Sequence, residues 1–298
     1  MPMIRRRLRR SLRVPPGQTV RLTEYKTGWA VNDTLKDAGK DAVKAKAKEL
    51  LEQRLEPLTA AQELLYATGE RAVLIVLQAM DAAGKDGTIK HVMSGINPQG
   101  CRVTSFKKPS DEERLHTFLW RCSKALPARG MIGIFNRSYY EDVLVTMVHP
   151  NLIGFEDDPG KKFWRRRYKD INAFEKHLVR NGTVILKFFL HVSKAEQKQR
   201  LIDRLDDSEK HWKFSTSDLA ERAYWDDYQH AYEECISATS TRWAPWYVVP
   251  ADQKWATRAI VAGIVCDTIT GLKLKQPEVS AEHRQALADA RRQLLAEG

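Results

Sequence analysis

The sequence predicts a doubly wound α/β fold with a mainly parallel sheet. Four continuous apolar runs, and a fifth shorter one, have the composition of strands that are buried on both faces. The stretches between them have helical periodicity, as expected of right-handed crossover connections between parallel strands. A chain of 298 residues is long enough to build one large domain of this class around a sizeable core.

The chain begins with a basic, turn-rich segment, residues 1–32, which we expect to be partly disordered or wrapped on the surface. The main domain is expected to span residues 33–275, followed by a helical tail over residues 276–298. Residues 33–67 carry leucines at helical spacing, and Pro57 predicts a division into two helices. The predicted strands are 72–77 (AVLIVL), 102–106 (RVTSF), 131–135 (MIGIF), 183–192 (TVILKFFLHV) and 246–249 (WYVV).

Two helix starts have a recognisable capping signal. Ser110 with Glu113, and Ser193 with Glu196, match the capping box, in which the hydroxyl and the carboxylate satisfy each other's backbone amides. We therefore expect helices to begin directly after Ser110 and Ser193. Two long stretches without such a signal, around residues 157–180 and 199–227, are helical in period and rich in Arg, Lys and Trp.

Composition favours a soluble, cytoplasmic protein. The formal net charge is +11, and six arginines before residue 14 supply part of it, which leaves about 11 − 6 = +5 for the remainder. The four cysteines lie far apart with no C-x-x-C pair, which argues against a disulfide framework and against a zinc site. No apolar run approaches the ~20 residues of a membrane span, and no secretory signal is visible.

The segment LIVLQAMDAAGKDGTIKHV predicts a buried strand, a tight glycine turn and a helix. Such a turn directs backbone N–H groups and the positive end of a helix toward one point, which suits a phosphate group, and Lys85 adds a full charge. Compared with G-x-x-x-x-G-K-[ST], the segment keeps Gly84 and Lys85 but has Ala79 for the first glycine and Asp86 for the hydroxyl residue. Alternatively, Gly84 and Gly87 only form a strand–helix turn and Lys85 is solvated.

A second polar block, IFNRSYYEDVLV, follows the third predicted strand. Ligands of open α/β sheets collect at the carboxyl ends of the strands, so Asn136, Arg137, Glu141 and Asp142 are expected near Lys85. The alternative is that Glu141 and Asp142 are exposed first-turn residues that complement a helix dipole.

A lysine pair follows the second predicted strand, in the sequence FKKPS. Lys107 and Lys108 therefore lie at the same edge of the predicted sheet. Beside a phosphate loop they are candidate anion contacts; otherwise they form a solvated surface pair.

Five sequence blocks together resemble the polyphosphate kinase 2 family: MDAAGKDG, FNRSYYEDVLV, FLHVSKAEQKQRL, KHWKFSTSDLAERAYWDDY and APWYVVPADQKW. The resemblance covers residues 14–270, with the blocks in the family's order. It implies a P-loop kinase-like three-layer α/β/α sandwich with a helical lid over about residues 157–227. It also implies reversible, Mg²⁺-dependent transfer of the terminal phosphoryl group of inorganic polyphosphate to AMP or ADP, giving ADP or ATP.

The resemblance also assigns individual residues. Asp81 matches the family's loop aspartate, Lys85 its loop lysine and Arg137 the arginine of its second motif. Some subgroups have Asp where this chain has Asn136, so an aspartate metal ligand is missing at that position. With this Asn and the acidic pair that follows, the chain resembles the subgroup that accepts both AMP and ADP.

Phosphoryl transfer depends on positioning and on neutralising charge more than on covalent help from the protein. We expect Asp81, Lys85, Arg137 and Glu141 to be the catalytic residues. Mg²⁺, or Mn²⁺ in its place, is expected on Asp81, Asp86 and Glu141, because hard cations prefer carboxylate and phosphate oxygens. No general base is required, because the attacking nucleotide phosphate is already ionised at neutral pH.

The polyphosphate donor carries about one charge per phosphate, so several cations are needed to bind it. We expect donor binding by one set of loop and side-chain groups: Ala82, Ala83, Gly84, Lys85, Asp86, Gly87, Lys107, Lys108, Arg137, Arg200, Arg204, Lys210 and Lys213. The arginines of 165–167 are expected to close over it. For Arg200 and Arg204, the alternative is a solvated helix face paired with Asp203 and Asp207.

Two other functions stay open on the sequence alone. An ATP-dependent P-loop nucleotide kinase is one, although such enzymes usually keep the full loop motif that this chain breaks at both ends. A non-enzymatic nucleic-acid-binding protein is the other, suggested by the basic tail, but no recognition motif is visible. The expected partners are inorganic polyphosphate and adenine or guanine nucleotides, without nucleic acid or membrane, in a homodimer or homotetramer.

Overall fold

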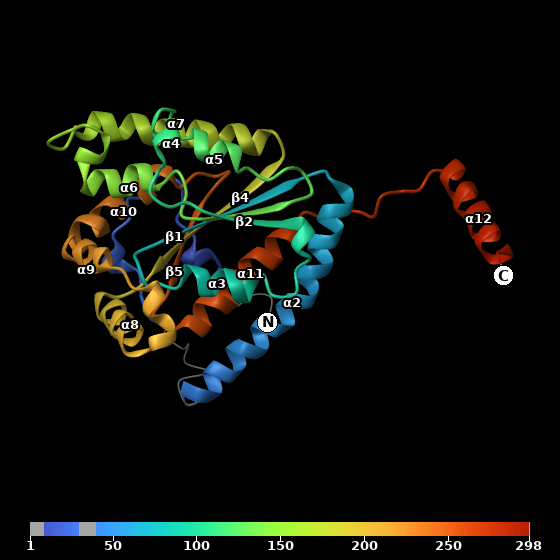
Figure 1. Ribbon diagram of the computed structural model, residues 1–298, viewed down its shortest axis with the longest axis horizontal. Coiled ribbons are helices and arrows are strands. Elements are labelled where there is room, and N and C mark those ends of the chain that lie inside the picture. The colour runs from blue at the N-terminus through green and yellow to red at the C-terminus, as the bar shows by residue number, and fades with distance from the viewer. Residues whose placement is uncertain (1–8, 30–39, 298) are drawn as a thin grey trace.

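The computed structural model describes residues 9–29 and 40–297. Over this range a five-stranded, all-parallel sheet lies between two groups of helices (Figure 1). The strands are β1 (Ala72–Ala79), β2 (Cys101–Ser105), β3 (Ile132–Asn136), β4 (Thr183–His191) and β5 (Trp246–Pro250). The predicted fold class is confirmed, and each of the five predicted strands is present within one or two residues of its expected bounds.

The strand order β2-β3-β1-β4-β5 places β1 at the centre. The chain passes from β1 to β2, returns to β3 beside β1, and then crosses to β4 on the other side of β1. The winding direction therefore reverses at β1, and a ligand site is expected at the carboxyl ends of the strands there. The register pairs Leu77 with Asn136, so the segments that follow β1 and β3 emerge next to each other.

One face of the sheet is covered by α3 (Lys85–Val92) and α11 (Lys254–Thr270), with α2 (Lys40–Thr68) packed along α11. The prediction that Pro57 divides α2 into two helices is wrong, because a single helix runs through it. Pro57 is exposed, whereas Leu58 and Leu65 are fully buried. The packing of this apolar stripe holds the helix together across the missing N–H of the proline.

The opposite face is covered by α6 (Glu141–Val148), α7 (Lys161–Arg180) and α10 (Trp225–Thr239), with the short α4 (Asp111–Arg114) and α5 (Trp120–Lys124) beside them (Figure 1). Helix α7 buries Trp164, Tyr168, Ile171, Glu175 and Leu178 against this layer. The first of the two Arg- and Trp-rich stretches is therefore a sheet-covering helix.

The second stretch forms α8 (Lys194–Asp206), the 3-10 helix η5 (Ser208–Lys213) and α9 (Thr216–Ala223). We refer to these three elements as the lid segment. Its helices follow β4 at the carboxyl edge of the sheet, on the same side of the molecule as the start of α3 (Figure 1). Further 3-10 turns lie at η1 (Leu22–Glu24), η3 (Pro98–Gly100) and η4 (Pro150–Ile153).

Both predicted helix starts are confirmed. The Ser110 hydroxyl accepts a hydrogen bond from the Glu113 N–H while the Glu113 carboxylate accepts from the Ser110 N–H, which is a complete capping box. The Ser193 hydroxyl accepts from the Glu196 N–H at 3.1 Å. There the box is half formed, because the Ser193 N–H donates to Asp252 at 2.7 Å instead.

The described part of the N-terminal segment, residues 9–29, is tied to the body. The Val14 N–H donates to the Trp246 carbonyl at 2.9 Å, and Arg13 forms an antiparallel bridge with Tyr247. The side chains of Val14, Val20 and Leu22 are buried in the core. The segment thus covers the exposed edge that β5 would otherwise present. The first eight residues of the predicted basic tail lie outside the described residues.

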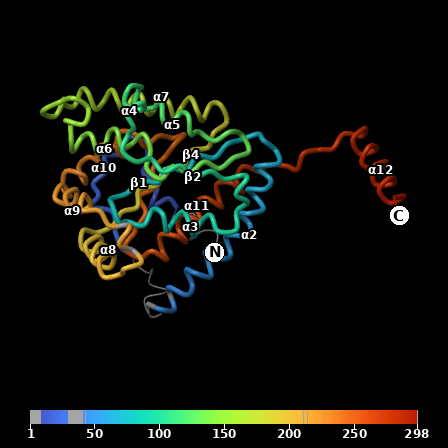
Figure 2. The backbone as a smooth tube through the Cα atoms, viewed as in Figure 1, coloured from blue at the N-terminus to red at the C-terminus, as the bar shows by residue number. Residues whose placement is uncertain are grey.

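The predicted C-terminal helical tail corresponds to α12 (Ala281–Ala296), which stands apart from the body in Figures 1 and 2. Among the described helices, none combines the length and the apolar character required to cross a bilayer.

Candidate active site

The turn that follows β1 forms the floor of the site. Ala82 and Gly84 have left-handed backbone conformations, with φ of +59° and +103°. Glycine adopts this conformation without strain, whereas Ala82 adopts it at a cost, as is common in functional loops. Helix α3 starts at Lys85, and the Lys85 ammonium folds back over the turn to donate to the carbonyls of Ala79 at 2.9 Å and Met80 at 3.5 Å. The predicted strand, turn and helix are confirmed.

Arg137 lies between two carboxylates above this turn. Its Nη2 is 2.5 Å from Asp81 Oδ1, and its Nη1 is 3.3 Å from Glu141 Oε2. The backbone of Arg137 is also left-handed, with φ of +65°, and its N–H donates to the Leu77 carbonyl of β1 at 3.0 Å. The structure therefore brings Asp81, Lys85, Arg137 and Glu141 together at the edge where the sequence predicted them.

A second polar cluster joins the ends of β2 and β3 to the start of α3. The Asn136 amide donates to Asp86 Oδ1 at 2.7 Å and to the Ser105 hydroxyl at 3.4 Å. An aspartate at position 136 would need to be protonated to donate in the same way. Asn136 therefore places a neutral donor beside Asp86.

The lid segment supplies a wall that the sequence did not predict residue by residue. A small cavity lies between the turn and this wall, and the lid residues that line it are Gln197, Asp218, Glu221 and Arg222. The Gln197 amide donates to the Asp81 carbonyl at 3.1 Å and accepts from Arg222 at 2.5 Å. These residues fall within the family-like blocks, but their spacing alone gave no signal that they face the loop.

Arg200 lies behind the turn and does not face the cavity. Its guanidinium donates to the carbonyls of Ala82, Ala83, Ala251 and Asp252, at 2.6 to 3.1 Å, and to the Glu196 carboxylate at 2.8 Å. The residue is only 4% exposed, and these contacts engage all three of its nitrogens. The expectation that Arg200 contacts the donor is thus corrected. Arg200 holds the turn between β1 and α3, residues 80–84, which we call the phosphate loop, against the segment that follows β5.

The other predicted donor contacts have different surroundings. Lys107 and Lys108 are exposed at the end of β2, and Arg121 fixes this end by donating to the Lys107 carbonyl at 2.8 Å. Arg204 lies 3.3 Å from Asp218 in the lid segment. Lys210 and Lys213 belong to η5, but their side chains lie outside the described residues.

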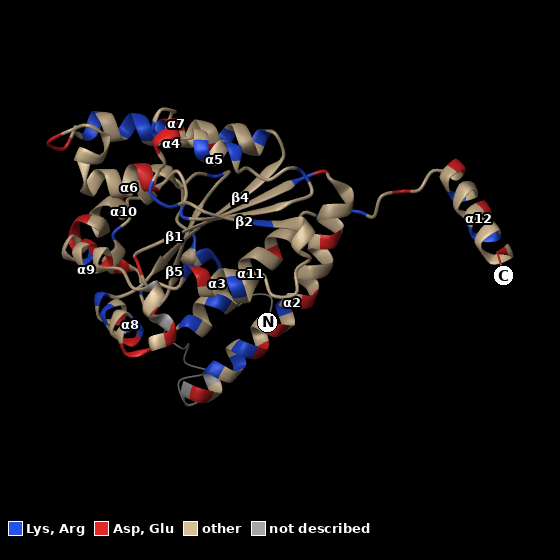
Figure 3. Cartoon of the chain, viewed as in Figure 1, with Lys and Arg blue, Asp and Glu red and all other residues tan. Residues whose placement is uncertain are grey.

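The arginines of α7 belong to a helix that covers the sheet. Arg165 and Arg166 are exposed residues of α7, a helix that carries several cations along its length (Figure 3). Arg167 donates to the Asp142 carbonyl at 2.5 Å, and its guanidinium lies over the rings of Phe118 and Phe163. Arg167 is thus engaged within the layer that covers the sheet, and the expectation that Arg165 and Arg166 close over the donor stays a prediction.

Burial and charge shift the pKa of Lys85 and Arg137 in the site and of the neighbouring Asp142. The Asp142 carboxylate lies 3.6 Å from Arg121 and does not line the cavity, so Asp142 does not join the Lys85 loop as the sequence predicted. Burial, aided by the charge of Arg137, lowers the pKa of Lys85 to about 8, against the opposing effect of the nearby carboxylates. Glu141 is the main cause of the raised pKa of Arg137, so this guanidinium stays charged. Burial raises the pKa of Asp142 to about 6, against the opposing charges of Arg121 and Arg167.

The three predicted metal ligands do not form a metal cage by themselves. Within residues 9–29 and 40–297, no group of three or more His, Cys, Asp or Glu side chains is arranged to hold a metal ion. The contacts described above engage one oxygen each of Asp81, Asp86 and Glu141. Mg²⁺ is usually bound by one or two carboxylates together with phosphate oxygens and water. These residues therefore fit a metal that arrives with its phosphate ligand.

Comparison with known proteins gives consistent results. The family model for polyphosphate kinase 2 matches residues 40–277. An ADP-polyphosphate phosphotransferase of Rhodopseudomonas palustris is 54% identical over 252 residues, which cover 83% of this chain and 87% of that protein. An AMP/ADP-polyphosphate phosphotransferase of Meiothermus ruber is 50% identical over 248 residues, which cover 83% of this chain and 89% of that protein.

A solved structure agrees with these sequence matches. The crystal structure of polyphosphate kinase 2 from Arthrobacter aurescens superimposes with a TM-score of 0.82 at 44% sequence identity. The superposition covers 97% of this chain and 96% of that one, so it includes the sheet, the loop and the lid segment.

The position of Arg200 leads to a stability prediction. Arg200→Ala should lower the free energy of unfolding by about 3 kcal/mol, because it leaves buried backbone carbonyls without donors. Arg204→Ala, in the same helix but partly exposed, should cost under about 1 kcal/mol. Urea denaturation followed by circular dichroism measures both. Equal unfolding midpoints for Arg200→Ala and the wild-type protein would contradict the bracing role.

Proposed function

The chain belongs to the polyphosphate kinase 2 family, and we propose on this basis that the site at the carboxyl ends of β1 and β3 carries out phosphoryl transfer between polyphosphate and nucleotides. The protein is a phosphotransferase that converts AMP or ADP to ADP or ATP with inorganic polyphosphate as donor, and the reaction is reversible. One observation supports the location most strongly: Lys85 and Arg137 lie at a glycine turn among three carboxylates.

Lys85 and the start of α3 bind phosphate oxygens in this proposal. The ammonium has three N–H donors, and the carbonyls of Ala79 and Met80 accept two of them. The third can donate to a phosphate oxygen. The backbone N–H groups at the N-terminus of α3 point toward the same place, and the helix dipole favours the negative charge.

Arg137 neutralises the charge that develops on the transferred group. A guanidinium that is held by carboxylates on both sides does not need to reorganise when that charge appears, which is the condition for strong electrostatic catalysis. Asp81 and Glu141 act by orienting Arg137. Neither needs to remove a proton, because the attacking phosphate oxygen of the nucleotide is already ionised.

Asp81, Asp86 and Glu141 would hold Mg²⁺, or Mn²⁺, together with phosphate oxygens. The metal would supply further neutralisation of phosphate charge. Lys107, Lys108 and Arg204, with the η5 lysines, remain our proposed contacts for the rest of the donor chain.

We further propose that the enzyme is cytoplasmic and forms a homodimer or homotetramer. The four cysteines form no disulfide in the part of the chain that the structure describes, which is compatible with a reducing compartment. The broad helical surfaces are suited to self-association.

The most direct test supplies the purified protein with ADP and polyphosphate in the absence of ATP, and measures ATP formation by luminescence. The wild-type protein should form ATP, and Lys85→Ala and Arg137→Ala should each lose at least about a thousandfold in kcat, comparable to the loss of an electrostatic catalyst. Lys90→Ala, an exposed lysine on the same helix, is the matched control and should retain full activity.

Two outcomes would contradict the proposal. Full activity in a folded Lys85→Ala or Arg137→Ala protein would remove that residue from the mechanism. Absence of ATP formation from polyphosphate, with transfer from ATP to AMP intact, would instead identify an ATP-dependent nucleotide kinase.

Ionic strength should weaken donor binding more than nucleotide binding. A polyanion that contacts several cations releases bound counterions, so its affinity falls steeply with salt. We expect the KM for long-chain polyphosphate to rise at least about tenfold between 50 and 500 mM KCl. The KM for ADP, measured in the same series, should change less. A KM for polyphosphate that does not respond to salt would contradict an extended cationic donor site.

The lowered pKa of Lys85 should limit activity at high pH. With a pKa of about 8, the free enzyme loses the Lys85 charge as the pH rises through this value, so kcat/KM for polyphosphate should fall above pH 8. Bound phosphate stabilises the charged form, so the corresponding fall in kcat should lie at higher pH. Rate profiles from pH 6 to 10 measure both, and a constant kcat/KM up to pH 9.5 would contradict the assignment.

The titration of Lys85 should make the folded protein more stable as the pH rises, whereas it lowers the activity. Because the pKa of Lys85 is lowered from 10.5 on folding, the unfolded chain binds this proton more tightly than the folded protein does. The contribution of Lys85 to stability therefore rises with pH between about 8 and 10.5.

A further inference from the structure

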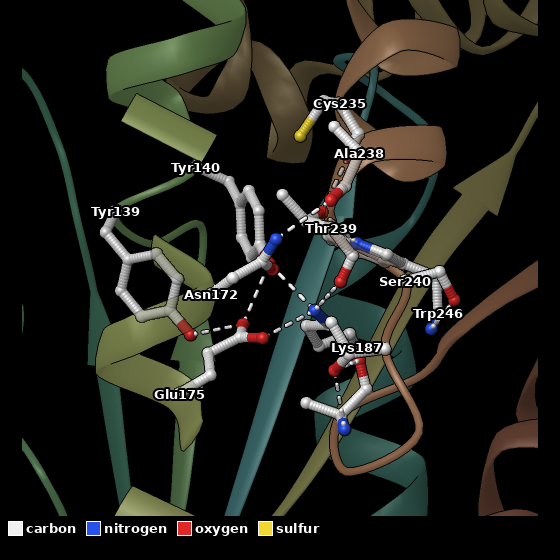
Figure 4. Close-up of polar contacts among 12 residues, drawn as sticks. Tyr139, Tyr140, Asn172, Glu175, Lys187, Cys235, Ala238, Thr239, Ser240 and Trp246 are labelled. Carbon is white, nitrogen blue, oxygen red and sulfur yellow. Dashed lines mark hydrogen bonds and ion pairs between the residues drawn. The ribbon is translucent and has the colours of Figure 1, made fainter. Parts of the chain in front are cut away.

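A buried ion pair contacts two tyrosines of the segment that follows β3 (Figure 4), and neither member of the pair lines the cavity. Lys187 of β4 and Glu175 of α7 have fully buried side chains, and Lys187 Nζ is 2.7 Å from Glu175 Oε2. The Lys187 ammonium also donates to the Tyr140 hydroxyl and to the Thr239 carbonyl, both at 2.8 Å. Glu175 Oε1 accepts from the hydroxyls of Tyr139 at 2.9 Å and Tyr140 at 2.8 Å.

Every donor in this network has an acceptor. The ammonium has three N–H groups and three acceptors, while the Tyr140 hydroxyl both donates to Glu175 and accepts from Lys187. Burial raises the pKa of both tyrosines well above the ordinary value, so both hydroxyls stay protonated and able to donate. A closed network of this kind permits one arrangement of its members.

The two tyrosines lie inside the catalytic motif. Arg137, with its strained left-handed backbone, comes two residues before Tyr139, and Glu141 directly follows Tyr140. Both tyrosine side chains have no exposed surface. The hydroxyl contacts therefore fix the short stretch of chain that joins Arg137 to its carboxylate partner.

The network also crosses the central strand. Lys187 is in register with Val76 of β1, whose other neighbour in the sheet is Phe135 of β3. The bond from Lys187 to Tyr140 therefore connects β4 with the segment that follows β3, over the strand that carries the phosphate loop. The aromatic rings of Tyr140 and Trp246, whose centroids are 4.8 Å apart, also pack against the Lys187 ammonium.

Stability alone does not account for this arrangement. Buried ion pairs lose hydration, and replacement by apolar side chains of similar volume is often neutral or stabilising. A buried, fully bonded charge pair is instead well suited to specifying a single geometry.

We propose that Glu175 and Lys187 are positioning residues for phosphoryl transfer, which hold Arg137 and Glu141 in place through the hydroxyls of Tyr139 and Tyr140. The inference rests on the proposed function of the site. Neither residue touches a substrate; the pair acts through the tyrosines that it orients.

A matched set of variants separates positioning from stability. Glu175→Met/Lys187→Met removes both charges and nearly keeps the volume, but it leaves the hydroxyls of Tyr139 and Tyr140 and the Thr239 carbonyl without these partners, so it should fold with a lowered unfolding midpoint. Its kcat should fall 10- to 100-fold, as expected when a catalytic group is displaced by about 1 Å, with the KM values for ADP and polyphosphate within threefold of the wild-type values. Glu175→Gln/Lys187→Met keeps an oxygen that accepts from both tyrosines and should recover most of the lost kcat.

Two further proteins serve as controls. Leu65→Ala, in the core of α2, should lower the melting temperature without changing kcat at 25 °C, which shows that lower stability by itself does not reduce the rate. Tyr139→Phe/Tyr140→Phe keeps the ion pair and removes three hydroxyl contacts, two to Glu175 and one from Lys187, so it should show the same loss of kcat. This variant gives the test if the methionine protein does not fold.

The proposal is overturned if the folded methionine variant, or the phenylalanine variant, has a kcat within twofold of the wild-type value. A glutamine variant no more active than the methionine variant would also overturn it. The wild-type protein in the same assay tests the proposed function separately, because it must form ATP from ADP and polyphosphate whatever the variants do.

Discussion

The bond between the Arg137 guanidinium and the Asp81 carboxylate joins the segments that follow two adjacent strands of a parallel sheet. This bond depends on the strand order, which places the carboxyl ends of β1 and β3 side by side. It also depends on two strained backbone positions, Ala82 and Arg137, that the surrounding structure must hold. The chemistry of the site is thus a consequence of how the sheet is ordered and how two turns are restrained.

Both turns are restrained from behind by buried cations. Arg200 joins two carbonyls of the phosphate loop to two carbonyls that follow β5, and Lys187 holds the segment after β3 through Tyr140 and the Glu175 carboxylate. Neither cation faces the cavity, so substrate charge does not have to compete with these contacts. Lys85 and Arg137, the two cations proposed for the transferred phosphate, can then meet it without a large rearrangement of the loops.

The sequence was sufficient to predict what depends on local pattern. Each strand, the glycine turn and the motif after β3 is one continuous stretch of sequence. Their apolar runs and helix-start signals can therefore be recognised in the sequence itself. Contacts between distant segments were less accessible. Arg200 has the sequence spacing of a solvated helix face. The backbone carbonyls that accept from it nevertheless lie 51 to 118 residues away in the sequence. In the sequence, nothing distinguishes Glu175 from the other charged residues of its helix, or Lys187 from the other residues of its strand. Pro57 predicted a helix break that tertiary packing overrides.

The most direct measurement is a crystal structure of the protein with ADP and a polyphosphate chain bound. The account predicts phosphate oxygens within hydrogen-bonding distance of Lys85 and Arg137, with Arg137 still between Asp81 and Glu141. A polyphosphate chain bound elsewhere, with Lys85 facing open solvent, would contradict it.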